Sequence, residues 1–121
     1  MACKDILIVE DDPDIRDSLK EILQFEGYNP ETASNGQEGV EKLRVMSNPC
    51  LILLDLMMPV MNGWQFLEYR ALHSPLSSIP VVVVSAQTHQ SKPAQVVAFL
   101  KKPLELDAFL KLVSIFCKKN N

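Results

Sequence analysis

Chemically active side chains stand at or just past the ends of four short apolar runs in this chain: Glu10, Asp11, Asp55, Ser85 and Lys102. The runs are rich in Ile, Leu and Val, and their sequences are ILIV, CLILL, VVVV and VVAFL. If folding brings these side chains together, three carboxylates, one hydroxyl and one ammonium group share a site. Such groups bind cations and phosphoryl groups. The residue types therefore predict a metal and phosphoryl site.

The apolar runs themselves predict how the site is assembled. Runs of this composition, separated by helix-length segments, are typical of parallel strands buried on both faces of a sheet. Parallel strands point the same way, so the residues past their ends meet at the carboxyl edge, where open α/β sheets bind ligands. We expect strands at 4–9, 28–33, 50–54, 81–84 and around 98–100, and helices at 13–26, 37–45, 63–72 and 105–118.

These elements predict a doubly wound α/β fold with helices on both faces of the sheet. The strand at 28–33 contains Pro30 and should lie near an edge. Asp12 is a plausible N-cap for the first helix, Pro13 suits its first position, and Gly27 suits its end. The helical periodicity predicts these core-facing residues: Ile15, Leu19, Ile22, Leu23, Val40, Leu43, Trp64, Phe66, Leu67, Leu106, Phe109, Leu110, Val113 and Phe116.

Length, charge and composition restrict the class of protein. The 121 residues fit one domain, spanning 1–121, and the net charge of -3 argues against non-specific nucleic-acid binding. No apolar stretch approaches the roughly 18 residues of a membrane span, and no signal peptide precedes the first strand. We expect a soluble, cytoplasmic protein. Cys3, Cys50 and Cys117 lack metal-ligand spacing and are expected to be small core or surface residues in a reducing compartment.

Glu10, Asp11 and Asp55 are the candidate ligands of a divalent cation. Two carboxylates about 4 Å apart repel by roughly 4 kcal/mol at an effective dielectric constant near 20. A cation removes this cost, and an all-oxygen ligand set favours a hard ion such as Mg²⁺ over zinc. Neither His73 nor His89 is spaced to join a metal site, and both are expected at the surface.

Asp55 is also a candidate nucleophile that accepts a phosphoryl group as an acyl phosphate. Transfer of this kind depends mainly on positioning and on neutralisation of charge, which the cation and a lysine would supply. Lys102 is the candidate lysine, with Lys101 as its competitor, and side-chain alternation places the two on opposite faces. Ser85 ends its strand, where its hydroxyl could donate to a phosphoryl oxygen.

Over essentially its whole length the chain resembles the receiver domains of response regulators, the CheY-like modules of two-component signalling. The matching segments are ILIVEDD at 6–12, LLDLMMPVMNG at 53–63, VVVVSA at 81–86 and FLKKP at 99–103. The most specific part is Asp55 followed at set distances by Met58-Pro59 and then Gly63. The resemblance implies the strand order 2-1-3-4-5, which the periodicity leaves open.

The resemblance also assigns roles at the acidic end of the site. Asp55 matches the phosphorylated aspartate of the family. Glu10 and Asp11 match the acidic pair that holds Mg²⁺, with Asp11 as a direct ligand and Glu10 acting through water. The backbone carbonyl of Met57 matches a third protein ligand.

Three further positions match residues of the family's switch. Ser85 matches the hydroxyl residue, and Phe99 matches the aromatic side chain whose rotamer moves with it. Lys102 matches the lysine that contacts the phosphoryl group. The Lys102-Pro103 bond matches one that is cis in this family.

One segment departs from the family pattern. Only 13 residues separate Ser85 from Phe99, which is short by more than one helical turn for a helix plus a loop. We expect the fourth helix of the family to be reduced to about a turn or replaced by a loop. Because the face built on that helix commonly carries dimers or output contacts, dimerisation through it is doubtful.

The resemblance implies a phosphoacceptor switch rather than an enzyme, with self-catalysed transfer and autodephosphorylation only. Its expected partners are a sensor histidine kinase or a histidine phosphotransfer protein, and a downstream protein target; no contact with nucleic acid or membrane is expected. Two alternatives stay open. One is a receiver-like interaction module that needs no phosphorylation. The other is an aspartate-nucleophile phosphatase, although such enzymes want a second acid where this chain has Met57.

Overall fold

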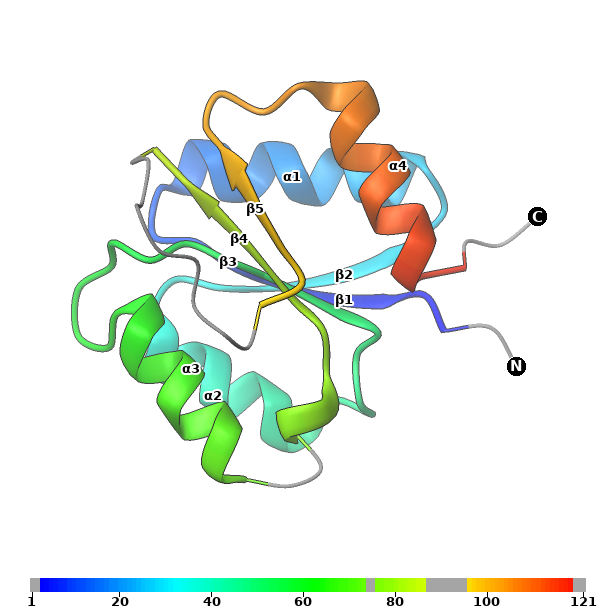
Figure 1. Ribbon diagram of the computed structural model, residues 1–121. Coiled ribbons are helices and arrows are strands. Elements are labelled where there is room, and N and C mark those ends of the chain that lie inside the picture. Colours follow the sequence, from blue (N-terminus) through cyan, green and yellow to red (C-terminus); the bar gives the residue numbers. More distant parts are fainter. Residues whose placement is uncertain (1–2, 74–75, 87–95, 119–121) are drawn as a thin grey trace.

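A five-stranded parallel sheet lies between two layers of helices in the computed structural model (Figure 1). The structure describes residues 3–73, 76–86 and 96–118. The strands are β1 (Asp5–Val9), β2 (Asn29–Ala33), β3 (Leu51–Leu54), β4 (Val81–Ser85) and β5 (Ala98–Lys101). The helices are α1 (Pro13–Phe25), α2 (Gly36–Val45), α3 (Gly63–Leu72), the short 3₁₀ helix η1 (Leu76–Ser78) and α4 (Leu106–Phe116).

The strand order is β2-β1-β3-β4-β5, with every neighbouring pair parallel. This confirms the doubly wound fold class and the order that the family resemblance implied. β2 lies at an edge, as its proline predicted. The segment in which we expected a reduced fourth helix includes residues 87–95, which lie outside the described part of the chain, so that expectation and its consequence for dimerisation stay predictions.

The apolar strands form a core on each face of the sheet. Alternate residues of one strand point to opposite sides, so Ile6 and Ile8 pack in one core and Leu7 and Val9 in the other. α1 and α4 cover the first face, and α2 and α3 cover the second (Figure 1). Burial on both faces fixes the register of each strand, because a shift by one residue would exchange the two cores.

The ends of α1 follow the local sequence. Asp12 caps the helix by accepting hydrogen bonds from the backbone N–H groups of Asp14 and Ile15, and Pro13 occupies the first turn. Gly27 then adopts a φ of 93°, a backbone conformation that glycine takes without strain. These contacts confirm the expected start and end of the helix.

Two residues that we expected in the core are exposed instead. Trp64 is 38% exposed because the buried face of α3 runs through Gly63, Phe66 and Leu67, and Trp64 is turned away from it. Leu106 is 48% exposed because it begins α4 at the rim of an open groove. Within the described residues, no helix combines the length and apolar character needed to cross a bilayer.

Gly63 begins α3 against the backbone that carries Asp55. A Cβ at this position would lie 2.6 Å from the Asp55 carbonyl oxygen and 2.7 Å from the Leu56 Cα. At Gly39 the nearest atoms are side-chain carbons of Phe66 and Val9, at 3.0 and 3.1 Å. Side chains can move aside more easily than backbone, so the two glycines differ in how much they tolerate a methyl group.

We therefore expect Gly63→Ala to lower the free energy of unfolding by about 2–3 kcal/mol, through overpacking against backbone. Gly39→Ala is the matched control and should cost about 1 kcal/mol or less, since alanine also favours the helix. Urea unfolding followed by circular dichroism measures both values. Equal stability of the two variants would contradict the close packing at Gly63.

Candidate functional site

Three carboxylates meet at the carboxyl edge of the sheet. Glu10 and Asp11 follow β1, Asp55 follows β3, and these strands are neighbours in the sheet. One carboxylate oxygen from each residue lies within 4.8 Å of the other two, the only such group of acidic, cysteine or histidine side chains among the described residues. Glu10 and Asp55 are 2% and 6% exposed, whereas Asp11 is open to solvent.

Backbone hydrogen bonds fix this edge in place. The N–H of Asp55 donates to the Val9 carbonyl at 2.9 Å, and the N–H of Glu10 donates to the Ala33 carbonyl at 3.0 Å. The Asp12 N–H donates to Glu10 Oε2 at 3.2 Å. The backbone of Glu10 and Asp55 therefore takes its position from the sheet, and the Asp12 N–H helps to orient the Glu10 carboxylate.

Lys102 supplies the opposite charge. Its Nζ lies 2.6 Å from Glu10 Oε1 and 4.0 Å from Asp55 Oδ2, and its side chain is largely buried. The Lys102 N–H donates to the Ser85 carbonyl at 2.8 Å, and the Lys102-Pro103 bond is cis, as the resemblance predicted. Lys101, the competing candidate, is exposed.

Asp55 is electrostatically the most perturbed group of the site. The pKa of its carboxyl is raised to about 7, chiefly by burial and next by the negative charge of Glu10. The positive charge of Lys102 acts in the opposite direction, and a hydrogen bond with Asp11 favours the protonated form. The cause is the crowding of acids, with one lysine shared between two of them.

Ser85, Phe99 and Met57 surround the acids. Ser85 ends β4 with no exposed surface. Phe99 lies on the neighbouring β5, opposite Val83 in the ladder, and is partly buried against the core of the α2 and α3 face. Met57 is 56% exposed, and its N–H donates to Asp55 Oδ1 at 3.3 Å.

The loop from Asp55 to α3 is held at several points. Val60 adopts a φ of 68°, a strained conformation for a β-branched residue that costs on the order of 1–3 kcal/mol. The loop is kept in this shape by the Gly36 N–H, which donates to the Met61 carbonyl at 2.9 Å, and by the capping box of Asn62 and Gln65. Val60 is 81% exposed, so no core contact explains its conformation.

The donor set fits a hard divalent cation. Carboxylates of Glu10, Asp11 and Asp55 are all-oxygen ligands, as Mg²⁺ prefers. The open position of Asp11 gives solvent access to the cluster, and Mg²⁺ keeps several waters when it binds proteins. The donor set therefore suits magnesium better than zinc, whose sites in proteins are built mainly from cysteine and histidine.

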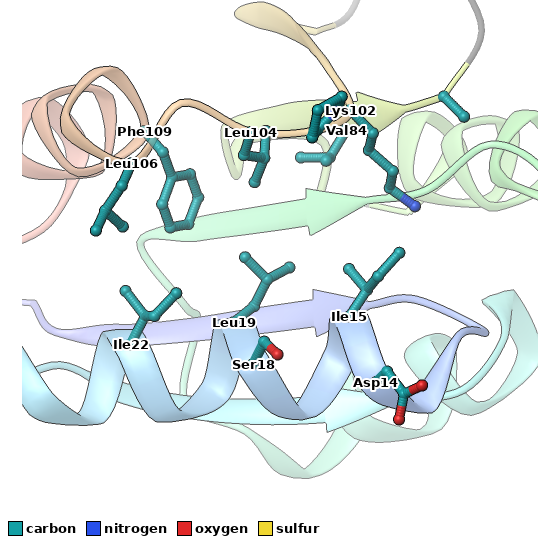
Figure 2. A pocket seen from close by; sticks show the side chains of 12 residues that line it. Asp14, Ile15, Ser18, Leu19, Ile22, Val84, Lys102, Leu104, Leu106 and Phe109 are labelled. Atoms are coloured by element: carbon teal, nitrogen blue, oxygen red, sulfur yellow. The ribbon is translucent and has the colours of Figure 1, made fainter.

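A groove of about 700 Å³ begins beside Lys102 and runs between α1 and the segment leading into α4. Figure 2 shows Ile15, Leu19 and Ile22 on one wall. The opposite wall carries Leu104, Leu106 and Phe109 (Figure 2). The groove is mostly apolar and connects the site with the exposed surface of α1.

Two features of the site were not expected from the sequence. The Arg16 guanidinium donates to the Glu10 carbonyl at 3.2 Å and brings a second positive charge to the acidic segment. An arginine one turn into a helix that follows three acids is a weak signal of this contact. No sequence pattern predicted the groove, because its walls come from segments that are far apart in the sequence.

Comparison with known proteins identifies the family. The model of the response regulator receiver domain matches residues 6–114. The response regulator MprA of Mycobacterium sp. (strain KMS) is 36% identical over 112 residues, covering 87% of this chain and 46% of the relative. The CpxR homolog of Haemophilus influenzae, a transcriptional regulatory protein, is 39% identical over 83 residues, covering 68% of this chain and 34% of the relative. The chain thus spans less than half the length of these curated relatives.

Solved structures of response regulator proteins have the same fold as this chain. The chemotaxis protein CheY4 of Vibrio cholerae superposes with a TM-score of 0.85 at 28% identity, covering 95% of this chain and 99% of the other. The response regulator TrrA of Thermotoga maritima, solved in complex with Mg²⁺-BeF, gives a TM-score of 0.82 at 29% identity, covering 93% and 98%. By family match, sequence identity and fold, this chain belongs to the response regulator receiver domains of two-component signalling.

Proposed function

We propose that this receiver domain is a phosphoacceptor switch, in which Asp55 accepts a phosphoryl group from a phosphohistidine. The observation that carries the proposal is the buried Asp55 carboxylate beside two further acids, with the Lys102 ammonium 4.0 Å away. The donor is a sensor histidine kinase or a histidine phosphotransfer protein. The reaction stops at the acyl phosphate and its hydrolysis, so the domain acts on itself and not as an enzyme on other substrates.

In the proposed transfer a carboxylate oxygen of Asp55 attacks the phosphorus in line with the imidazole nitrogen. A P–O bond forms, the P–N bond breaks, and the released imidazole takes up a proton. Lys102 lies between Glu10 and Asp55, where its ammonium can pair with a phosphoryl oxygen. The charge and position of these side chains supply most of the catalysis expected for phosphoryl transfer.

Glu10, Asp11, Asp55 and the Met57 carbonyl are the residues that would hold Mg²⁺, with Glu10 acting through water. When bound, the ion neutralises charge on the phosphoryl oxygens and on the acids. The protein's own part is to hold three carboxylates within 4.8 Å of one another, an arrangement that repels the incoming group unless positive charge is present.

Ser85 and Phe99 are the proposed switch. After transfer, the Ser85 hydroxyl would donate to a phosphoryl oxygen, and the Phe99 ring would move inward beside it. Ser85 ends β4, and Phe99 lies on the neighbouring β5, where it pairs with Val83, two residues before Ser85. Phe99 is only partly buried, so its ring has room to change position. Such a change biases a two-state equilibrium and alters the surface offered to a downstream protein.

The groove beside Lys102 is the proposed contact for the phosphodonor protein. A donor that presents a phosphohistidine to Asp55 must cover the carboxyl edge of the sheet, and the groove opens next to that edge. Its apolar walls suit an apolar helix face. Leu106 and Ile22 line both this groove and a smaller hollow around Phe25, so the apolar surface continues along α1.

Incubation with acetyl phosphate and Mg²⁺ should add one phosphoryl group to the wild-type chain, detected by intact-mass spectrometry. Asp55→Asn should take up none, because the nucleophilic oxygen is lost, and chelation of Mg²⁺ should reduce wild-type labelling at least tenfold. An unlabelled wild type would favour an interaction module without phosphorylation. Sustained turnover of free phosphoesters would favour a phosphatase.

The raised pKa of Asp55 predicts a pH-dependent stability. Below pH 4 the carboxyl is protonated in the folded and the unfolded chain. Between about pH 4 and pH 7 the unfolded chain has released its proton while the folded chain retains it, so stability falls as pH rises through this window. Asp55→Asn removes the penalty, and its Tm should exceed that of the wild type by several degrees more at pH 8.5 than at pH 5.

Calorimetry in the presence of a chelator measures this difference. Comparing the same two proteins at both pH values cancels effects of the amide that do not depend on pH. An equal Tm difference at pH 5 and pH 8.5 would mean that Asp55 ionises at an ordinary pKa in the folded protein.

Leu106→Asp should slow phosphoryl transfer from a protein donor without slowing transfer from a small-molecule donor. We expect transfer from a phosphorylated histidine kinase to slow about tenfold, since a charge in the groove opposes apolar docking by about 1.4 kcal/mol. Labelling by acetyl phosphate should stay within twofold of the wild type. Val45→Asp is the control, because Val45 is an exposed apolar residue of α2 on the opposite face.

Any histidine kinase that labels the wild-type chain can serve as the donor. Equal slowing by Leu106→Asp and Val45→Asp, or loss of labelling by acetyl phosphate in Leu106→Asp, would remove the groove from the proposed contact.

A further inference from the structure

One residue of the loop after Asp55 has a backbone conformation that its own side chain disfavours. Val60 has a φ of 68°, and it is the only non-glycine residue with a positive φ in the described part of the chain. Glycine takes this conformation freely and asparagine tolerates it, whereas the branched Cβ of valine collides with the backbone. The strain therefore comes from the presence of valine at this position.

The shape of the loop is imposed from both sides of Val60. On one side the Met58 side chain is 9% exposed, in the core of the α2 and α3 face. On the other side the Met61 carbonyl accepts a hydrogen bond from the Gly36 N–H at 2.9 Å. Only Pro59 and Val60 connect these anchors, and a proline ring fixes its own φ at about −65°. The unusual φ therefore falls on Val60, whichever residue stands there.

The Val60 side chain gains nothing from the rest of the domain. It is 81% exposed, and it belongs to neither of the two cores. An exposed isopropyl group and a strained backbone are both unfavourable in the domain alone. Strain that the packing of the domain does not explain is typical of functional positions. Both costs are offset only if the side chain is covered in a complex.

Val60 belongs to an apolar strip beside the phosphoryl site. Met57, Pro59 and Val60, which form the strip, are all exposed, whereas Asp55 is 6% exposed. The Met57 N–H donates to Asp55 Oδ1 at 3.3 Å, so the strip begins in contact with the phosphoacceptor. In Figure 1 this loop, between β3 and α3, projects from the carboxyl edge of the sheet. A protein that brings a reactive group to Asp55 must therefore lie close to the strip.

We propose that Val60 is a specificity-determining contact for the protein that donates the phosphoryl group. This inference rests on the proposed function, in which a phosphohistidine transfers its phosphoryl group to Asp55. Before transfer, the phosphorus must come within about 3–3.5 Å of an Asp55 oxygen. The surface around the donor histidine then touches the loop that follows Asp55. The occupant is this face of the donor, with an apolar side chain packed against Val60.

The apolar strip and the groove beside Lys102 flank Asp55. The groove lies between α1 and the segment leading into α4, whereas Met58 and Met61 anchor the loop on the α2 and α3 face. A donor that covers both apolar surfaces is fixed in orientation over Asp55, as in-line transfer requires. A downstream target has no need to reach Asp55, and a second copy of the chain that covered the strip would block the donor. The donor is therefore the occupant that fits both surfaces.

Variants at Val60 separate the apolar contact from the backbone strain. Val60→Asn removes the contact and relieves the strain, and Val60→Leu keeps an apolar side chain without a branched Cβ. The Tm of Val60→Asn, followed by circular dichroism, should exceed that of the wild type by about 2–5 °C. Leu72→Asn is the matched control, because Leu72 is also 81% exposed but ends α3, about 14 Å along the helix from Gly63.

The test measures phosphoryl transfer from acetyl phosphate and from a panel of phosphorylated histidine kinases, each at several concentrations. For the kinase that labels the wild type fastest, Val60→Asn should raise the KM about tenfold and leave the maximal rate within about twofold, as expected when a binding contact is lost. Val60→Leu should stay within about threefold of the wild-type KM, and Leu72→Asn should match the wild type. Labelling of every variant by acetyl phosphate should stay within about twofold of the wild type.

Failure of this inference can be told from failure of the proposed function. If acetyl phosphate does not label the wild type, the proposed function fails and this inference fails with it. If acetyl phosphate labels every variant and the kinase KM is equal for Val60→Asn and Leu72→Asn, only the contact at Val60 fails.

Three other results would also overturn the contact. Loss of labelling by acetyl phosphate in Val60→Asn would mean that Val60 shapes the site itself. A wild-type dimer that Val60→Asn dissociates would assign the strip to a second copy of the chain. A panel in which no kinase labels a wild-type chain that acetyl phosphate does label would exclude a histidine-bearing protein as the occupant.

Discussion

Crowded negative charge at the carboxyl edge of the sheet is the constraint on which the site depends. Glu10, Asp11 and Asp55 present oxygens within 4.8 Å of one another, and backbone hydrogen bonds of the sheet hold Glu10 and Asp55 in position. Lys102 offsets part of the repulsion, but it is shared, at 2.6 Å from Glu10 and 4.0 Å from Asp55. The remaining imbalance explains both the raised pKa of Asp55 and the affinity that such a site should have for a divalent cation.

The stability of the rest of the fold offsets the repulsion between these carboxylates. Both faces of the strands are buried, so register and strand ends are fixed by two cores at once. Gly63 lets α3 begin against the backbone of Asp55, where any larger residue would collide. The strained Val60 belongs to the same loop. A stable sheet and a rigid loop thus carry an edge that is unfavourable by itself, as is common at functional sites.

Much of this could be predicted from the sequence, for identifiable reasons. The apolar runs predicted the strands, Asp12 and Pro13 predicted the start of α1, and the motif around Asp55 predicted the family and strand order. The prediction that Trp64 and Leu106 lie in the core was wrong, because periodicity gives the direction of a side chain but not whether a neighbouring element covers it. The groove beside Lys102 comes from tertiary packing of distant segments, which leaves no local pattern. The roles of Ser85, Phe99 and Met57 were taken from the family resemblance, and they stay proposals.

The most direct measurement is a carbon-13 NMR titration of the Asp55 side-chain carboxyl, without divalent ions and again with Mg²⁺. The account predicts an apparent pKa near 7 in the metal-free protein, because burial and Glu10 oppose ionisation. With Mg²⁺ the same resonance should titrate at a much lower pH, since the cation stabilises the carboxylate. An Asp55 carboxyl that titrates near 4 under both conditions would show that the acids are neither crowded nor coupled to a cation, and would contradict the account.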